Sequence, residues 1–220
     1  SVGNTNMLSD YAAIKNGSYG KLMKAYYAKQ DAEKLSGKGD TSQKLTLMKT
    51  SADSLKKSAD ALNDSSLWEK KKIKKKDEKT GEEIEVEDYD WDKITKAVKS
   101  FVEDYNDVVK EAGESNTKDV LRNASWMTGM TDKNSNMLAK IGITIGKGNK
   151  LELDEDALKQ ADISSLKTVF TGYNSFVSKI SQKATGISNA ANRASATYTN
   201  NGTYSKTDSS LTSSKIDKEV

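Results

Sequence analysis

The sequence predicts a mainly α fold, an elongated antiparallel helical bundle with two small β-hairpins. Apolar residues recur at helical spacing in several long segments, and strand-like runs joined by glycine-containing turns occur beside them. There is no proline among the 220 residues, so long helices are spared their usual breaker. Hydrophobic residues make up 35% of the chain and charged residues 30%, which suits helices that each bury one stripe better than a bulky spherical core.

One elongated helical domain is expected over residues 1–194, followed by a polar tail over 195–220. The parts of the domain are N-terminal helices (1–66), a charged β-hairpin (67–92), and helices with a second hairpin at 141–153 (93–194).

Tyrosines mark the N-terminal segment. Residues 6–35 place apolar and tyrosine side chains at helical spacings, with a turn indicated at Asn16–Gly17, so two short helices or one interrupted helix would form. Its tyrosines form either a packed stripe or a contact surface for a partner, since tyrosine is enriched at interfaces as well as in cores. The candidate partner-binding residues are Tyr19, Tyr26 and Tyr27.

A heptad seam follows between Thr46 and Trp68. Its apolar positions are Met48, Ala52, Leu55, Ala59 and Leu62. The seam covers only about two heptads and uses small alanines, which indicates close antiparallel packing within one chain.

The charged hairpin has opposite signs on its two halves. Residues 70–76 hold six lysines and residues 82–92 hold seven acids, with a glycine-containing loop between them. Lysines would face acids across the ladder, and each opposed pair contributes a few tenths to about 1 kcal/mol. A self-neutralised solvated hairpin is favoured over a nucleic-acid site, because the basic run brings its own acidic competitor to any phosphate contact.

The strongest amphipathic helix is predicted over residues 94–112. Asp90 or Asp92 is its candidate N-cap, and Gly113 stands where a C-terminal cap would. Its apolar stripe consists of Ile94, Ala97, Val98, Phe101, Val102, Tyr105, Val108, Val109 and Ala112. One face of this helix must be buried.

Two short helices are expected within residues 116–140. The loop between them carries one aspartate and two asparagines at alternate positions from Asp132, as at the start of a calcium loop. Met137 stands where such a loop needs glycine, and Ile143 where it needs the bidentate glutamate, so no calcium site is predicted.

The second hairpin, 141–153, alternates isoleucines, turns at Gly-Lys-Gly-Asn, and alternates leucines. Asp154 is the expected N-cap of the next helix, with Glu155 and Asp156 in the first turn, where the helix dipole favours negative charge. These three carboxylates therefore indicate capping and not catalysis. The turn is no phosphate loop, because it precedes a strand and not a helix.

A second long helix is predicted from about Ser164 to Arg193, with a break near Gly172. Its apolar stripe is expected to pack on the 94–112 helix. The tail, 195–220, is rich in serine, threonine and asparagine and cannot bury much apolar area. We expect it to be extended against the body or held by a neighbouring molecule.

The residue types exclude most enzyme chemistry. Without cysteine or histidine the chain has no disulfide, thiolate zinc site, Cys or His nucleophile–base pair, or imidazole acid. Its acids and lysines show no catalytic spacing. We predict that the protein is not an enzyme, and that it has no catalytic residues, metal site or cofactor. No apolar run is long enough to span a membrane, and the first residues lack the features of a secretory signal.

The order of these elements resembles the C-terminal half of hook-associated protein 2, the flagellar filament cap protein. The helix motif of that family is matched by Ile94, Val98, Phe101, Val102, Tyr105 and Asn106. A later motif is matched by Ile141, Gly142, Ile143, Leu151, Leu153, Asp154 and Leu158. A third motif is matched by Leu166, Val169, Phe170, Thr171 and Gly172. The resemblance covers about residues 84–187, and residues 1–66 match no part of the family.

The resemblance implies a non-enzymatic structural or assembly protein. Its implied partners are itself, in a ring, and flagellin-like subunits, with no nucleic acid. Export through the flagellar route would place it outside the cell, on the bacterial flagellum. An alternative is a secreted or surface module that binds an unknown partner on the same scaffold, through Tyr19 to Tyr27 or the tail. A nucleic-acid binder using Lys70 to Lys76 is a third hypothesis.

Overall fold

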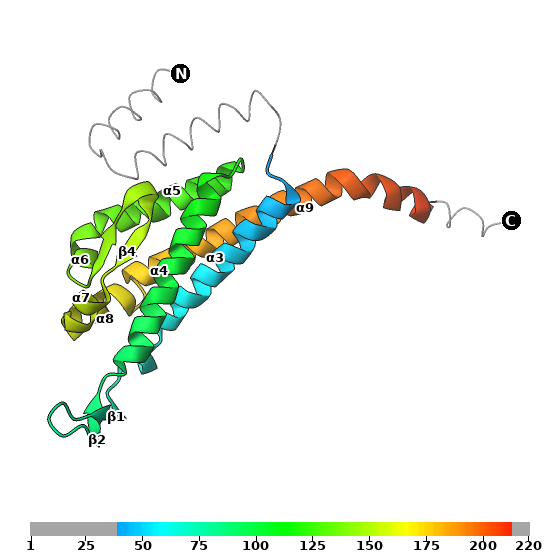
Figure 1. Ribbon diagram of the computed structural model, residues 1–220. Coiled ribbons are helices and arrows are strands. Elements are labelled where there is room, and N and C mark those ends of the chain that lie inside the picture. Colours follow the sequence, from blue (N-terminus) through cyan, green and yellow to red (C-terminus); the bar gives the residue numbers. More distant parts are fainter. Residues whose placement is uncertain (1–38, 213–220) are drawn as a thin grey trace, which may run out of the picture.

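Helices dominate the described part of the chain, and two small antiparallel hairpins complete it (Figure 1). The structure is a computed structural model that describes residues 39–212, with side chains described as far as residue 197. The helices are α3 (Ser42–Asn63), α4 (Trp91–Gly113), α5 (Lys118–Lys133), α6 (Ser135–Ala139), α7 (Glu155–Gln160), α8 (Ile163–Phe170) and α9 (Phe176–Thr212). The strands are β1 (Lys71–Lys76), β2 (Glu83–Asp88), β3 (Ile143–Ile145) and β4 (Leu151–Leu153), and the short 3-10 helices are η1 (Ser65–Trp68) and η2 (Lys147–Asn149). The predicted fold class is confirmed.

Four helices form the elongated body (Figure 1). The helix α3 packs against α4 and α9, and α5 contacts the same two helices. Asp53 on α3 bonds Ser188 on α9, whereas Asp60, further along α3, bonds the earlier Ser181, so α3 and α9 run antiparallel. The predicted antiparallel bundle is therefore present.

The seam predicted on α3 lies in the core. Its five apolar positions are at most 2% exposed, and Ala52 and Ala59 are fully buried. Thr41 caps the helix by accepting a hydrogen bond from the Lys44 backbone N–H at 3.2 Å. Because alanine adds only a methyl group to the helix surface, neighbouring helices can approach α3 closely along this seam.

The predicted pairing of the two long amphipathic helices is wrong. The main neighbours of α9 are α3 and α5, and those of α4 are α3 and α5, so α4 and α9 lie diagonally across the bundle. They share the core through long side chains, with the Phe101 and Phe176 ring centroids 6.3 Å apart. The alanine seam of α3 explains this arrangement, because it accepts a helix on each side.

The helix α4 begins as predicted. The Asp90 side chain accepts a hydrogen bond from the Lys93 backbone N–H at 3.1 Å and caps the helix. The predicted stripe is buried apart from Ala97, which is partly buried. Gly113 was expected to cap the C-terminal end, but it is the last residue of α4 and its φ is not positive, so this expectation is wrong.

Both predicted hairpins are present and antiparallel. In the first, Lys71 pairs with Asp88 and Lys76 with Glu83. In the second, which packs on the bundle, residues 143–145 pair with residues 151–153. Asp154 then caps α7 as predicted, because its side chain accepts from the Ala157 backbone N–H at 3.0 Å.

The break near Gly172 is confirmed, because α8 ends at Phe170 and α9 begins at Phe176. Gly172 has a φ of +100°, a backbone conformation that favours glycine. The Asn63 side chain accepts from the Gly172 N–H at 2.8 Å and donates to its carbonyl oxygen at 3.4 Å, which ties this turn to the end of α3.

The polar segment after Ala194 is not extended as far as it is described. The helix α9 continues through it to Thr212, so the expectation of an extended tail is wrong up to that residue. Helical backbone satisfies its own N–H and C=O groups and needs no buried stripe for that purpose. The division of the chain at residue 194 stays a prediction, and α9 runs across it.

Gly142 offers a direct test of the second hairpin. Its φ is +87°, and a Cβ there would lie 2.7 Å from the Asp154 carbonyl oxygen. An alanine at this position would strain the backbone, and its Cβ would overlap the Asp154 carbonyl oxygen. Gly142→Ala is therefore expected to lower the free energy of unfolding by about 1–3 kcal/mol in urea denaturation. Gly113→Ala is the matched control, since a Cβ at Gly113 meets nothing within 4 Å. Equal losses in the two variants would contradict this account.

Candidate interaction surfaces

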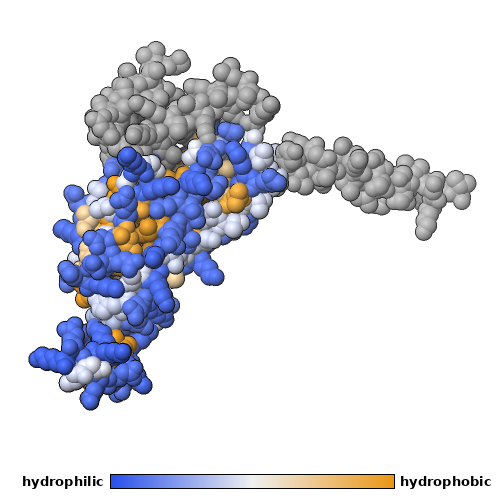
Figure 2. Space-filling view, in the orientation of Figure 1, coloured by the Kyte–Doolittle hydropathy of each residue, from blue (hydrophilic) through white to orange (hydrophobic). Residues whose placement is uncertain are grey.

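The β1–β2 hairpin stands beyond one end of the bundle and is densely charged (Figures 1 and 2). The opposed charged pairs are Lys71 with Asp88, Lys72 with Glu87, Lys74 with Glu85, and Lys76 with Glu83. The predicted charge ladder is therefore confirmed. Within the two strands, the single ion pair runs diagonally from Lys75 to Asp88, so most of these charges remain solvated.

The two faces of this hairpin differ in chemistry. Because side chains alternate along a strand, the register places Ile73, Ile84 and Val86 on one face, together with the Lys75–Asp88 ion pair. We call this the apolar face of the hairpin. The opposite face carries only lysine and glutamate. Ile84 is 39% exposed, and none of the three apolar residues belongs to the hydrophobic core or packs against it.

Aromatic residues fix the base of the hairpin to the bundle. The Trp68 Nε1–H donates to the Leu62 carbonyl oxygen at 2.7 Å, and the Trp68 ring stacks on Phe170 with centroids 5.8 Å apart. The Tyr89 ring lies against Trp91 at 6.2 Å, and two lysine ammonium groups lie 5.7 and 6.0 Å from it. The hairpin therefore leaves the body from a well-anchored point.

A polar ladder runs along the α3–α9 contact. Asp53 accepts hydrogen bonds from Lys49 at 2.7 Å and from Ser188 at 2.6 Å. One heptad further on, the same arrangement is made by Asp60, Lys56 and Ser181. Burial alone would raise the pKa of both aspartates, but the hydrogen bonds from lysine and serine outweigh it and hold each pKa below its usual value. The two sets fix the register of α9 against α3.

A small cavity of about 110 Å³ opens between α3 and α9 beside the Lys49–Asp53 part of this ladder. It is lined by Leu45, Thr46, Lys49, Thr50, Asp53, Ala191, Asn192 and Ser195. Typical ligand pockets measure roughly 300–1,000 Å³, so this one suits water better than a substrate or a nucleotide cofactor.

An exposed tryptophan lies on α5. Trp126 is 57% exposed, and the Lys183 ammonium of α9 lies 4.2 Å from its ring centroid. Partial burial lowers the pKa of Lys183. A cation–π contact at such a site contributes about 0.5–1 kcal/mol, so this pair joins α5 to α9 at the surface.

The predicted partner-binding residues Tyr19, Tyr26 and Tyr27 lie outside the described residues. Their role stays a prediction.

The loop expected from Asp132 to Asn136 is wrong, because Asp132 lies in α5, Asn136 lies in α6, and only Asn134 separates the two helices. The Asn134 side chain donates to the Met130 carbonyl oxygen at 2.7 Å.

Within residues 39–212, no group of three or more His, Cys, Asp or Glu side chains is placed to hold a metal ion. Over the same range, no helix combines the length and the apolar character needed to cross a membrane.

Sequence reasoning did not find a buried acid at the start of the described chain. Asp40 is 8% exposed and accepts hydrogen bonds from the Ser115 hydroxyl (2.7 Å), the Asn116 backbone N–H (2.7 Å) and the Thr117 hydroxyl (2.6 Å). It thereby ties the approach to α3 to the α4–α5 loop. Its partners are more than 70 positions away in the sequence, so no local pattern indicates the contact.

Asn106 also has a role that its motif did not reveal. Its side chain donates to the Leu151 carbonyl oxygen at 2.9 Å and accepts from the Leu151 N–H at 2.7 Å. The amide thus supplies both bonds that a neighbouring strand would make to Leu151, and it joins the second hairpin to α4.

A comparison with known families bears on these surfaces. Residues 115–219 match the family model for the flagellar hook-associated protein 2 C-terminus. The resemblance inferred from the sequence is thereby confirmed over residues 115–187. The hook-associated protein 2 match begins after α4 and continues through the polar segment that the sequence analysis left outside the resemblance. No curated protein and no solved structure matches the chain.

The polar ladder predicts a pH dependence. Because the pKa values of Asp53 and Asp60 are lowered in the folded state, the stability they contribute is present above their unfolded values of about 3.9 and is lost as the pH falls through the folded values. Urea unfolding of Asp53→Asn/Asp60→Asn between about pH 5 and pH 2 should show a smaller loss of stability on acidification than the parent chain.

The matched control is Glu69→Gln/Glu78→Gln, which removes two exposed carboxylates outside the ladder. The control should keep the pH dependence of the parent. Parallel stability curves for the ladder variant and the control would rule out a contribution from the ladder.

Proposed function

We propose that the protein is a non-enzymatic structural protein of the bacterial flagellum, related to the filament cap, which acts by self-association and by contacts with flagellin-like subunits. The observation that carries the proposal is the match of residues 115–219 to the hook-associated protein 2 C-terminus. That family is structural and not enzymatic, and it forms the cap at the distal end of the extracellular filament, which supports this role and location for the protein.

The shape of the molecule supports a role based on contacts. The α3–α9 ladder, the Asp40 cluster and the aromatic base of the hairpin lock the helices into one elongated body. The helix α9 continues beyond the start of α3, at the end of the body opposite the hairpin (Figure 1). A long helix and a hairpin at opposite ends offer two separate places to meet neighbouring subunits.

The charge pattern disfavours the nucleic-acid hypothesis. Each lysine opposite a glutamate in the β1–β2 register has an anion beside it before any phosphate arrives. Phosphate binding gains free energy from releasing counterions, and this gain shrinks when the protein supplies the counterion itself.

Flagellin assembly provides the test. Substoichiometric purified chain should change the rate or the length distribution of flagellin polymers, followed by light scattering and electron microscopy. A chain truncated after Arg193 is the informative variant, because none of the α9 side chains described between residues 192 and 197 is buried. It should keep the cooperative unfolding of the bundle, lose only the helical signal of the removed part of α9, and lose most of its effect on flagellin. A full-length chain with no effect on flagellin assembly would contradict the proposal.

A further inference from the structure

We propose that the apolar face of the β1–β2 hairpin packs against the same face of a second copy of this chain, about a two-fold axis that runs along the hairpin. This inference rests on the self-association in the proposed function and assigns it a surface. The face consists of Ile73, Ile84 and Val86 with their charged neighbours on the same side of the ribbon.

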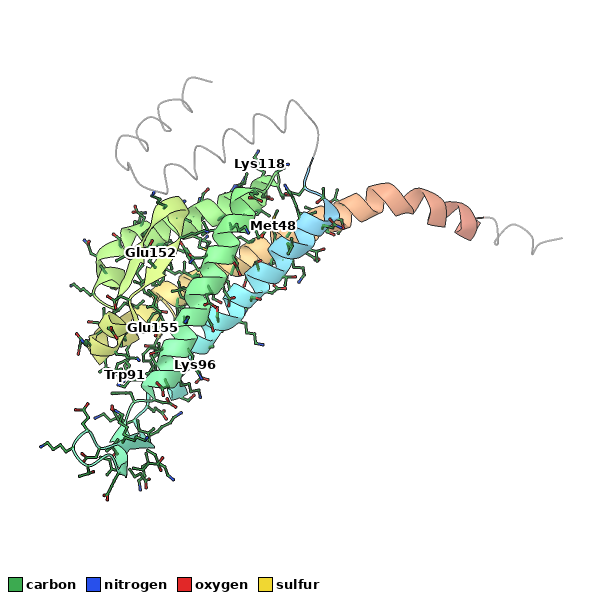
Figure 3. All side chains as sticks on the ribbon, viewed as in Figure 1. Met48, Trp91, Lys96, Lys118, Glu152 and Glu155 are labelled. Atoms are coloured by element: carbon green, nitrogen blue, oxygen red, sulfur yellow. The ribbon has the colours of Figure 1, made fainter. Side chains whose placement is uncertain are left out.

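The hairpin needs a cover that its own body does not supply. An isolated two-stranded hairpin is marginally stable in water, and a packed face is the usual remedy. Here the ribbon leaves the end of the bundle (Figure 3), and its three apolar side chains take no part in the core. Side chains on the two strands thus form an amphipathic ribbon whose apolar side carries one exposed and two partly buried residues.

The charges on the apolar face select the occupant and its orientation. Lys71 and Asp88 form one rung of the ladder, Ile73 and Val86 the next, on the same face. A two-fold axis along the hairpin lays β1 of one copy over β2 of the other. Lys71 then meets Asp88 of the second copy, and Ile73 meets Val86 of the second copy. Two of the three rungs on this face are therefore complementary. On the third, Lys75 lies over Ile84 of the second copy and keeps its ion pair with Asp88 of its own chain.

Other arrangements fit less well. A two-fold axis across the strands would place Lys71 over Lys75 of the second copy, and like charges at that distance repel. Pairing of strand edges would extend the ribbon but leave its apolar face in water. Where β1 met β1, such pairing would also bring two lysine-rich strands together. Natural sheet edges carry lysines because their repulsion prevents this kind of pairing.

The size of the face limits the strength of the contact. Two six-residue strands present a face of about 20 Å by 10 Å, or roughly 200 Å² per copy. Stable interfaces bury about 800 Å² per partner, so this contact is weak alone and acts beside other contacts in an assembly. Cross-linking, which traps short-lived contacts, is therefore a better readout than dimer mass.

The native chain has no cysteine, so single thiols report on the contact without interference. We would mix Ile73→Cys with a larger, tagged Val86→Cys chain and add a bismaleimide that spans about the 10 Å between packed sheets. The expected result is more heterodimer than the statistical mixture contains, and a total cross-linked yield several-fold above that of a control pair on the charged face.

The matched control is Lys74→Cys mixed with Glu85→Cys. These residues also face each other across the ladder, but they lie on the charged face. The control pair should give only the small amount of cross-linked dimer that random collisions between chains produce. A predominance of Val86→Cys homodimers would overturn the proposed axis, and equal yields in the two mixtures would overturn the face.

Charge reversal supplies a second measurement in the same assay. Lys71→Glu should lower the heterodimer yield several-fold, and Lys71→Glu with Asp88→Lys in every chain should restore it. An unchanged yield in Lys71→Glu contradicts the orientation. If cross-linking fails while the parent chain still alters flagellin assembly, the surface is wrong and the proposed function stands.

Discussion

The small side chains of α3 are the constraint on which the rest of the structure depends. Ala52 and Ala59 are fully buried, and α3 is the helix that packs closely on both α4 and α9. Because α4 and α9 both approach α3 closely, they lie diagonally across the bundle from each other, and the core between the helices is narrow. A chain with only 35% hydrophobic residues can fill such a core, whereas it could not fill a wide one. The low hydrophobic content of the chain and the alanine seam of α3 are therefore compatible, because the seam allows a core narrow enough for the available apolar residues to fill.

Antiparallel packing of α3 and α9 also determines which distant segments meet. With Asp53 beside Ser188, the end of α3 reaches the turn before α9, and Asn63 bonds the backbone of Gly172. The aromatic residues of four elements converge near that end, where Phe101 lies within 6.4 Å of Phe170 and 6.3 Å of Phe176. The hairpin begins immediately after Trp68, which stacks on this group. Its position is thus a consequence of core packing.

Sequence reasoning succeeded where a local pattern carries the information. The stripes of α3 and α4, the caps Asp90 and Asp154, and both hairpins follow from spacing and from residue types at helix and strand ends. It failed where the cause is a contact between distant segments. Periodicity shows that a helix has a buried face but not which helix covers it, so α4 and α9 were wrongly paired.

The same limit applies to single polar residues. Asp40 looks like any loop acid, and its burial is visible only once the α4–α5 loop is placed beside it. Asn106 entered the sequence argument as a motif position, while its two bonds to Leu151 depend on the second hairpin folding onto α4.

The alternation of charge on the first hairpin limits which partners it can select. A strand of lysines alone would attract any anion, with an affinity set by net charge and weakened by salt. Five strand lysines beside four strand acids leave almost no net charge, so attraction at long range is weak and the order of signs becomes the recognition element. A partner must then present charges of the opposite signs in the same order, at the spacing of residues along a β-strand. A second copy of the hairpin, turned about its long axis, presents that order, because Lys71 faces Asp88 on one rung of the apolar face and Ile73 faces Val86 on the next.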